Sequence, residues 1–318
     1  MNRRLIKKVL QQKHEDFVLS IKDERVQKLV KKNSIITGGC ITSMLLNEKV
    51  NDFDYYFTDL ETAQAVAEYF VKVFNELNPN ACKKENDGIR LSPPEVKVID
   101  GRVKIWIQSA GIIGEGSEEQ TYKYFEQHPE EEGMDYIENV IREADETDSS
   151  AMEGKSDIKF RPVYLSSNAI TLSDKVQLVI RFYGTPEEIH KNYDFIHCCN
   201  YWTSCDKELV LKPAAVESIL CKQLQYQGSL YPLCSIIRTR KFIKKGWNIN
   251  AGEYLKMCFQ LSQLDLSDVK VLEDQLVGVD SAYFRVLLDY CKKEEKNDPE
   301  FRVTVPYIVS LVDRIFGE

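Results

Sequence analysis

The sequence predicts an α+β protein in which a domain built on a mixed β-sheet is followed by a helical domain. Three observations predict this division. Short segments rich in β-branched residues or with alternating polarity, which are typical of strands, occur up to about residue 202. From Ala214 onward, apolar residues recur at helical spacing. Between residues 34 and 57, a strand pattern, a Gly-Gly turn, a short helical pattern and a second strand follow one another closely.

The N-terminal residues 2–33 carry apolar side chains at helical spacing, and the pattern breaks near Lys22-Asp23. Within the sheet domain we expect an amphipathic helix over 60–77 and a hairpin over 95–107 that turns at Asp100-Gly101. Further strands are expected at 164–172, 176–182 and 192–198. The C-terminal helices are expected at 214–225, 233–245, 251–264, 267–275, 281–292 and 305–316.

The predicted domains are an N-terminal helical segment at 1–33, a sheet domain at 34–205 and a helical domain at 206–318. An acidic insertion at about 115–157, with fifteen acidic and three basic residues, interrupts the sheet domain. A segment of such charge buries too little apolar surface to offset its ordering entropy. We therefore expect a solvated segment that the sheet domain does not need for folding. The alternative is a functional insertion, either a nucleic-acid mimic or a gate over the active site.

Composition places the chain among cytoplasmic proteins. Hydrophobic residues make up 43% of the 318 residues and charged residues 29%, and no apolar run is long enough to predict a membrane span. The N-terminus lacks the apolar core of a signal peptide. Nine cysteines include no Cys-x-x-Cys pair, which favours free thiols in a reducing cytosol. The alternative is a zinc site formed by two histidines and two cysteines, although their spacing matches no standard module: His190, His197, Cys198 and Cys205.

The net charge of −8 argues against a general nucleic-acid-binding protein. A basic run nevertheless extends from Arg238 to Lys245, and Trp247 follows it. Phosphates attract Lys and Arg, and bases stack on Trp, so this run, including Lys241, is the candidate contact for RNA or phosphate. The alternative is the solvated face of a helix whose apolar residues pack inward.

The most informative segment is residues 38–57. Gly38 and Gly39 permit a sharp turn and a close approach to a ligand, and the apolar spacing after them predicts a short helix. The first turn of a helix presents unpaired N–H groups that bind phosphate. On the following strand, Asp52 and Asp54 point to the same face, since strand side chains alternate. Two such carboxylates repel each other unless a cation lies between them. A phosphate site beside a metal site is typical of phosphoryl or nucleotidyl transfer.

This segment resembles the head motif of the nucleotidyltransferase superfamily that includes DNA polymerase β, poly(A) polymerases and tRNA CCA-adding enzymes. The match to the poly(A) polymerase and CCA-adding version has no gap from Gly38 to Asp54. One departure is that the family usually carries Arg-Asp where this chain has Thr42-Ser43. The departure puts CCA addition in doubt. The resemblance implies a nucleotidyltransferase head domain with a helical C-terminal domain that contacts the base and the acceptor.

Members of that superfamily usually place a third carboxylate on a neighbouring strand. Asp194, in the predicted strand 192–198, is the candidate, and its surroundings resemble those of nucleotidyltransferases from large viruses and phages. A satisfied polar residue at a sheet edge is the alternative reading of Asp194. Asp100 and Asp174 compete for the role, but both are read as turn residues. Ser166, Ser167 and Asn168 are candidate contacts to a sugar or base, or ordinary polar strand residues.

The resemblance implies a metal-dependent enzyme. Asp52, Asp54 and Asp194 would be both the catalytic residues and the ligands of Mg²⁺ or Mn²⁺. Gly38, Gly39 and Ser43 would hold the phosphates of an NTP substrate, and Asn168 and Lys241 would complete its binding. The expected acceptor is a hydroxyl of RNA, such as a tRNA or RNA 3′ end. The alternatives are a non-catalytic interaction protein that keeps the fold, of a viral or defence-related kind, and a toxin-type transferase that modifies host tRNA or protein.

Overall fold

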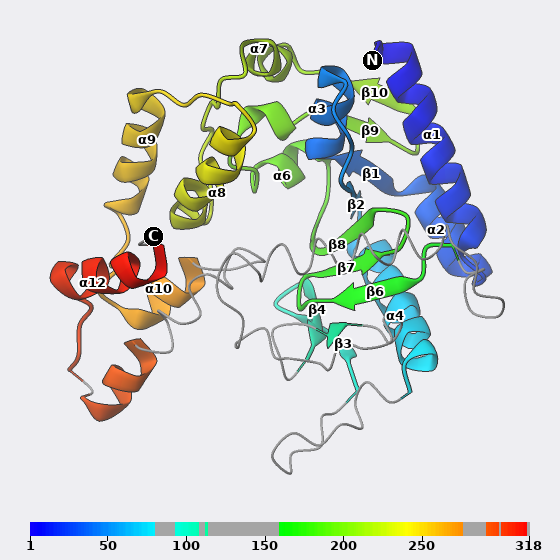
Figure 1. Ribbon diagram of the computed structural model, residues 1–318. Coiled ribbons are helices and arrows are strands. Elements are labelled where there is room, and N and C mark those ends of the chain that lie inside the picture. Colours follow the sequence, from blue (N-terminus) through cyan, green and yellow to red (C-terminus); the bar gives the residue numbers. More distant parts are fainter. Residues whose placement is uncertain (80–92, 108–111, 114–158, 276–290, 299, 317–318) are drawn as a thin grey trace. The chain divides into compact units, whose positions relative to one another are not determined.

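The computed structural model describes residues 1–79, 93–107, 112–113, 159–275, 291–298 and 300–316 (Figure 1). The chain divides into two compact units. The first holds the described residues up to Lys191 and also His197–Ile219, and the second holds Asn192–Ile196 and the described residues from Leu220 onward. The acidic insertion expected at 115–157 lies outside the described residues.

Two N-terminal helices, α1 (Arg3–Ser20) and α2 (Glu24–Lys32), are separated at the expected break. The Asn2 side chain accepts a hydrogen bond from the backbone N–H of Leu5 and begins α1, and Asp23 caps α2 in the same way. Their buried apolar residues share one core with the sheet. Residues 1–33 are thus part of the first unit and not a separate segment.

The first unit is built on an eight-stranded sheet in the order β10-β9-β1-β2-β8-β7-β6-β5. Only β2 and β8 pair in parallel among these strands, so the sheet is mixed and the predicted α+β class is confirmed. The strands are β1 (Ser34–Thr37), β2 (Phe53–Phe57), β5 (Ile112–Ile113), β6 (Pro162–Leu165), β7 (Ala169–Leu172), β8 (Val176–Tyr183), β9 (Tyr201–Thr203) and β10 (Glu208–Val210).

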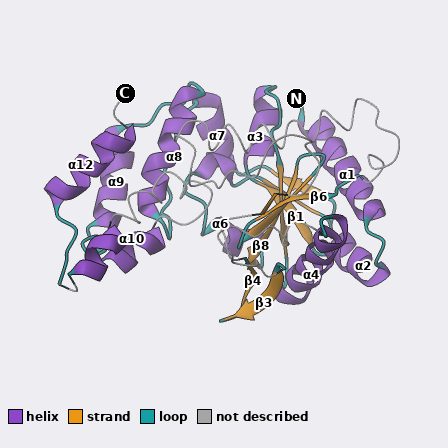
Figure 2. Cartoon of the chain, turned by 60° about the horizontal axis from the view of Figure 1, so that its bottom comes forward, coloured by secondary structure: helices purple, strands orange, loops and turns teal. Residues whose placement is uncertain are grey.

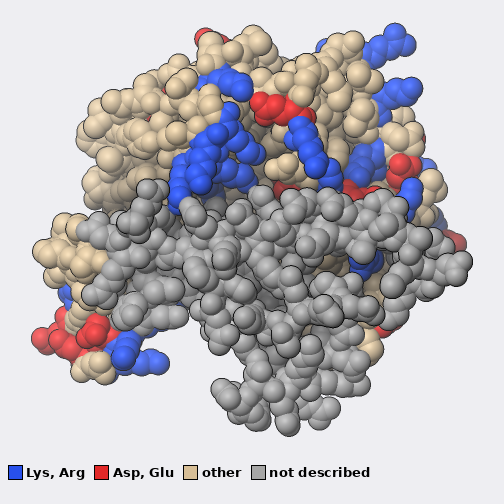
Figure 3. Space-filling view, in the orientation of Figure 1, with Lys and Arg blue, Asp and Glu red and all other residues tan. Residues whose placement is uncertain are grey.

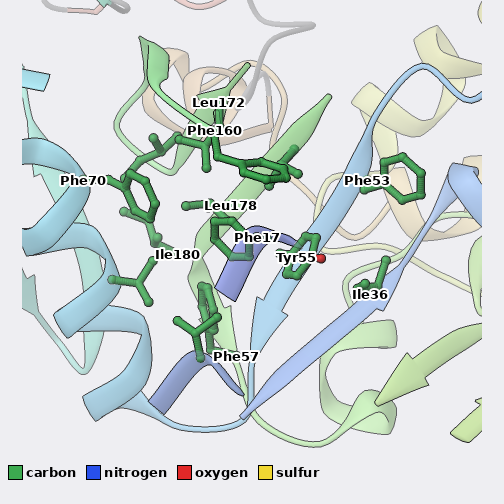
Figure 4. Packing of buried hydrophobic residues seen from close by; sticks show 14 of the residues in the cluster. Phe17, Ile36, Phe53, Tyr55, Phe57, Phe70, Phe160, Leu172, Leu178 and Ile180 are labelled. Atoms are coloured by element: carbon green, nitrogen blue, oxygen red, sulfur yellow. The ribbon is translucent and has the colours of Figure 1, made fainter. Parts of the chain in front are cut away.

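One face of this sheet is the core. Trp202, Ile36, Tyr55 and Leu178 are register partners across four adjacent strands, and each is fully buried. Aromatic residues such as Phe17 of α1 pack against them (Figure 4). The helix α4 (Leu60–Leu77), which has the predicted bounds, belongs to the same core. The helices α1, α2 and α4 lie on one side of the strands and α6 (Pro186–His190) on the other (Figure 2).

The opposite face carries a row of mostly polar side chains. Tyr201, Thr37, Asp54, Gln177 and Thr171 are register partners on β9, β1, β2, β8 and β7. Register partners point to the same face of a sheet, so these five side chains form one line across it. The site described below lies on this row.

The two predicted turn carboxylates occupy turns. Asp100 joins β3 (Glu95–Ile99) to β4 (Arg102–Trp106), and both Asp100 and Gly101 have positive φ angles of 49° and 69°. Asp174 and Lys175, with φ angles of 59° and 60°, join β7 to β8. These values are typical of the primed turns that suit hairpins. Both assignments from the sequence are confirmed.

The strand predicted at 192–198 is wrong. Thr185 and Glu188 form a capping box at the start of α6, and the chain then leaves the sheet. Asn192–Ile196 joins the second unit, where Phe195 makes an isolated bridge to Tyr226, and Ile196–Cys198 forms a 3₁₀ turn. The alternating polarity of this segment therefore reflects contacts with two different units and not the pleat of one strand.

The second unit contains helices at the predicted places. They are α8 (Pro232–Lys244), α9 (Ala251–Leu261), α10 (Val269–Gln275) and α12 (Val305–Phe316). Its buried core includes Cys234, Val269, Leu272, Cys291 and Val303. The unit begins at Leu220 and not at residue 206, because β9, β10 and most of α7 (Pro213–Cys221) belong to the first unit. The helix predicted at 281–292 lies mostly outside the described residues. No described helix is both long and apolar enough to cross a membrane.

Candidate active site

The turn between β1 and the helix α3 (Gly39–Leu46) forms one wall of the site. Gly38 caps the helix with φ of 86° and ψ of −152°, a conformation that L side chains rarely adopt. Its N–H donates to the Cys198 carbonyl at 3.2 Å. A Cβ built on Gly39 would meet nothing within 4 Å, so open space adjoins the first turn of the helix. This turn therefore has both the N–H groups and the room that a phosphate needs.

The two carboxylates lie near the helix that follows this turn. Asp54 lies on β2 and is half-buried, whereas Asp52 lies just before the strand and is exposed. The charges of both carboxylates act on the buried thiol of Cys40, which lies in the first turn of α3. Burial raises the pKa of Cys40 well above its usual range, and the charges of Asp54 and Asp52 raise it further. Both carboxylates thus lie within electrostatic reach of the helix N-terminus.

The donor set suits a hard divalent cation. Two carboxylates with access to solvent offer oxygen ligands, which Mg²⁺ and Mn²⁺ prefer. Within the described ranges, no three His, Cys, Asp or Glu side chains gather into a metal cluster. The predicted metal site would therefore rest on Asp52 and Asp54 alone, and an ion there would draw its other ligands from water or substrate. The four residues of the alternative zinc site, His190, His197, Cys198 and Cys205, are described, and they do not form such a cluster.

Asp194 lies in the second unit. Its carboxylate is 7% exposed and forms an ion pair with Arg238 of α8. Its backbone carbonyl accepts a hydrogen bond from the N–H of Gln227. Burial raises the pKa of Tyr226 to about 12, and the negative charge of Asp194 contributes to this rise. These contacts give Asp194 a role in fixing Asn192–Ile196 to α8. Its role as a third metal ligand stays a prediction.

Within the sheet, the residue beside Asp54 on β8 is Gln177 and not a carboxylate. The Gln177 side chain shares the face of Asp54, because parallel register partners point the same way. The alternating pattern of 176–182 predicts a strand. The residue of that strand that lies beside Asp54 is known only from the pairing of β8 with β2.

The remaining predicted binding residues are dispersed. Ser43 is half-buried in the second turn of α3, past the unpaired N–H groups, and the neighbouring Thr42 hydroxyl donates to the His197 carbonyl. The carbonyl of Asn168, in the turn between β6 and β7, accepts from the N–H of Ile180. Asn168 is thus about 10 Å along the strand direction from the level of Asp54 and Gln177. The structure does not bring it to the carboxylates.

In the second unit, Lys241 is exposed on α8. Trp247 is only 4% exposed and packs edge-on against Phe242. The predicted stacking of a base on Trp247 is therefore wrong, while the basic residues beside it remain accessible.

From the sequence, His190 was considered only as a zinc ligand, and its place beside the phosphate turn was missed. Its Nε2 lies 2.8 Å from the hydroxyl of Thr37, the residue before Gly38, and its Nδ1 lies 3.2 Å from the ammonium of Lys212. Burial, followed by the charge of Lys212, lowers the pKa of His190 to about 3. Contacts spanning 153 residues of sequence cannot be read from local patterns.

A protein-family model matches residues 8–222, which include nearly all of the first unit. The matching family is described as the Gabija anti-defense 2 family, Gad2. The chain belongs to the Gad2 family. No curated protein matches the chain.

Two solved structures with a similar fold are CCA-adding enzymes. The enzyme of Thermotoga maritima, complexed with tRNA, is 11% identical with a TM-score of 0.37, and the match covers 96% of this chain and 62% of that one. The enzyme of Bacillus stearothermophilus, in complex with CTP, is 11% identical with a TM-score of 0.33, and the match covers 78% of this chain and 45% of that one. The chain thus spans less than two thirds of the length of either enzyme.

Proposed function

We propose that this Gad2-family chain is a metal-dependent nucleotidyltransferase that moves a nucleoside monophosphate from an NTP to a hydroxyl of RNA. The observation that carries the proposal is the placement of two carboxylates, Asp52 and Asp54, beside an open Gly38-Gly39 turn at the start of α3. A site for metal and a site for phosphate adjoin each other there, and nucleotidyl transfer needs both.

Each group has a distinct task in this proposal. The N–H groups of the first turn of α3 bind phosphate oxygens of the NTP, and the absence of a side chain at Gly39 lets those oxygens approach the backbone. Asp52 and Asp54 hold Mg²⁺ or Mn²⁺. When bound, such an ion stabilises charge on phosphoryl oxygens and lowers the pKa of a coordinated hydroxyl. Asp52 and Asp54 would hold that ion from the start of β2.

The RNA acceptor is proposed from the basic face of the second unit. Arg240, Lys241, Lys244 and Lys245 are exposed on or just after α8. Lys and Arg side chains gather over this helix in the space-filling view (Figure 3). A clustered positive surface on an otherwise acidic protein favours a polyanionic partner over a small neutral acceptor.

A second candidate is a non-catalytic interaction protein on the same fold, and the family's name favours it. The name gives the family a role against a defence system called Gabija. Such a role needs an enzyme only if the defence is disarmed by chemical modification. In either case we place the protein in the cytoplasm of an infected cell, because a phage-type protein of this kind would act there and its described cysteines are free thiols.

The experiment that separates the two candidates has two readouts on the same variants. The purified chain is incubated with Mg²⁺, labelled ATP or CTP, and either total RNA or total protein. We expect label in the RNA fraction. In parallel, wild type and Asp54→Ala are tested for protection of phage against Gabija. If Asp54→Ala protects as well as wild type and no fraction takes label, the interaction role is correct and the enzymatic one is wrong.

A further inference from the structure

A buried polar chain leads from the phosphate turn to the cation of Lys212. Thr37 ends β1 immediately before Gly38, and its neighbours on the polar row are Asp54 on one side and Tyr201 on the other. The Thr37 side chain is fully buried, and His190 is 4% exposed. Polar groups at such depth are retained only with their hydrogen bonds satisfied.

The chemistry of the partners fixes the direction of this chain. An ammonium can only donate, so Lys212 Nζ donates to His190 Nδ1 over 3.2 Å. The Nε2 of a neutral imidazole then carries the proton and donates to Thr37 Oγ1 over 2.8 Å. The Thr37 hydroxyl in turn donates to the Asn200 carbonyl over 2.8 Å. Every donor has an acceptor only when His190 is uncharged, which agrees with its lowered pKa.

Lys212 is also fixed from two other directions. Its backbone N–H donates to Asn200 Oδ1 over 2.9 Å, and its ammonium lies 5.7 Å from the centre of the Tyr201 ring. The His190 and Tyr201 rings contact each other at 5.6 Å. The ammonium is therefore held by an aromatic wall and one neutral acceptor. Among the described residues, no Asp or Glu forms an ion pair with it.

An unneutralised, half-buried ammonium is costly unless an anion completes its surroundings. By contrast, Lys7 of the first unit has a carboxylate partner, Glu208, at 2.9 Å. Tyr201 lies two strands from Asp54, or about 10 Å. Lys212 is thus set at the far end of the polar row from the carboxylates, with the Gly38-Gly39 turn between them.

We propose that the Lys212 ammonium, positioned by His190, binds the terminal phosphate groups of the nucleotide. The proposal rests on the proposed function for the identity of the ligand. The carboxylates then hold the end of the phosphate chain that reacts, and Lys212 holds the end that leaves. His190 is a positioning residue, because it touches Lys212 and Thr37 and not the ligand.

The test measures binding of inorganic tripolyphosphate with Mg²⁺ by calorimetry at fixed ionic strength. Losing one charge-assisted contact weakens binding by about ten- to a hundredfold, so we expect that loss for Lys212→Ala. Lys212→Arg keeps the charge and is expected to bind within about tenfold of wild type. The control is Lys72→Ala, an exposed lysine of α4, for which we expect no change. Equal binding by wild type and a folded Lys212→Ala variant would overturn the proposal.

His190 is tested through its coupling to Lys212. His190→Ala is expected to weaken tripolyphosphate binding, and Lys212→Ala in that background is expected to add little, because the ammonium is already misplaced. Gln offers both a donor and an acceptor, so His190→Gln should restore part of the affinity. Additive losses from the two Ala variants would show that His190 does not act through Lys212.

These results separate the proposal from the proposed function. Binding of tripolyphosphate needs no turnover. A protein that binds it through Lys212 but transfers no label would refute the transferase role and leave the anion site in place. A protein that transfers label with the same KM for NTP in Lys212→Ala as in wild type would refute the anion site alone.

Discussion

The surroundings of Asp54 and of Asp194 differ in almost every physical respect. Asp54 is half-buried on β2, and its charge and that of Asp52 both act on Cys40 in the first turn of α3. Asp194 lies in a bend of the second unit, is 7% exposed and forms an ion pair with Arg238. One carboxylate is kept next to another negative charge, while the other is neutralised by a cation.

This difference teaches how a ligand site and a structural contact are told apart. Two carboxylates that lie close together repel each other unless a cation joins them, so such a pair is a candidate ligand site. Asp194 pairs with Arg238 through one carboxylate oxygen, while its other oxygen is buried without a hydrogen-bond partner among the described residues, so its charge is met by a contact within the protein. The comparison predicts that the two residues fail in different assays.

The largest expected effect is on transfer. Asp54→Ala or Asp52→Ala should lower the rate of label incorporation by about a thousandfold or more, as removal of a principal charge in an active site does. Far-UV circular dichroism and the unfolding transition should stay those of a folded protein, because neither side chain is part of the core. The matched control is Asp206→Ala, an exposed aspartate in the turn between β9 and β10. Full transfer by either site variant would refute the assignment.

The next effect is on stability. Asp194→Ala leaves the partly buried Arg238 without its partner, and we expect the free energy of unfolding to fall by about 2–4 kcal/mol, since Arg238 retains 28% exposure. Arg238→Ala should be comparably destabilising, and the double variant should cost less than the sum of the two. Urea denaturation measures these values. A variant Asp194→Ala that keeps its stability but loses transfer would show that Asp194 is a catalytic ligand after all.

The same contrast explains what the sequence could and could not predict. Local signals predicted the helix at 60–77 and the break near Lys22-Asp23, because caps and apolar spacing act within a few residues. The Asp52 and Asp54 pair was also local, since it depends on one strand and its preceding turn.

The failures all involve distant contacts. Asp194 and Arg238 are 44 residues apart, and Thr37 and His190 are 153 residues apart. The polarity of 192–198 alternates like a strand, yet Asp194 pairs with Arg238 of α8 and Phe195 makes only an isolated bridge to Tyr226. Gln177 was visible as a strand residue, but its place beside Asp54 depends on the pairing of β2 with β8. Tertiary pairing, which no local pattern encodes, decides such cases.

A smaller effect is the loss of folding stability at low pH that three buried histidines cause. His14, on the core face, has its pKa lowered to about 4 by burial, and His190 and His197 have theirs lowered to about 3. Between pH 6.5 and these values the unfolded chain binds more protons than the folded one, so stability falls as pH is lowered through this window. We expect a loss of about 1–2 kcal/mol per histidine between pH 7 and pH 5.

The measurement is urea denaturation of wild type and of His14→Gln, His190→Gln and His197→Gln at both pH values. Each Gln variant should have a smaller difference in unfolding free energy between pH 7 and pH 5 than wild type. A difference that is the same in all four proteins would show that carboxylates and not these histidines control the acid response.

The smallest effect is on the metal-free stability of the carboxylate pair itself. Asp52 is exposed, so its repulsion with Asp54 is largely screened, and the melting temperature of Asp52→Ala without divalent metal should be level with wild type or slightly higher. With divalent metal, the difference in melting temperature between Asp52→Ala and wild type should reverse its sign. A ligand that binds only the folded state raises its stability by RT ln(1 + [L]/Kd), so 10 mM Mg²⁺ should raise the melting temperature of wild type more than that of Asp52→Ala. Asp206→Ala controls for the loss of one negative charge and should respond to Mg²⁺ as wild type does. If Mg²⁺ shifts all three proteins equally, the two carboxylates do not form a metal site, and their proximity to α3 has another cause.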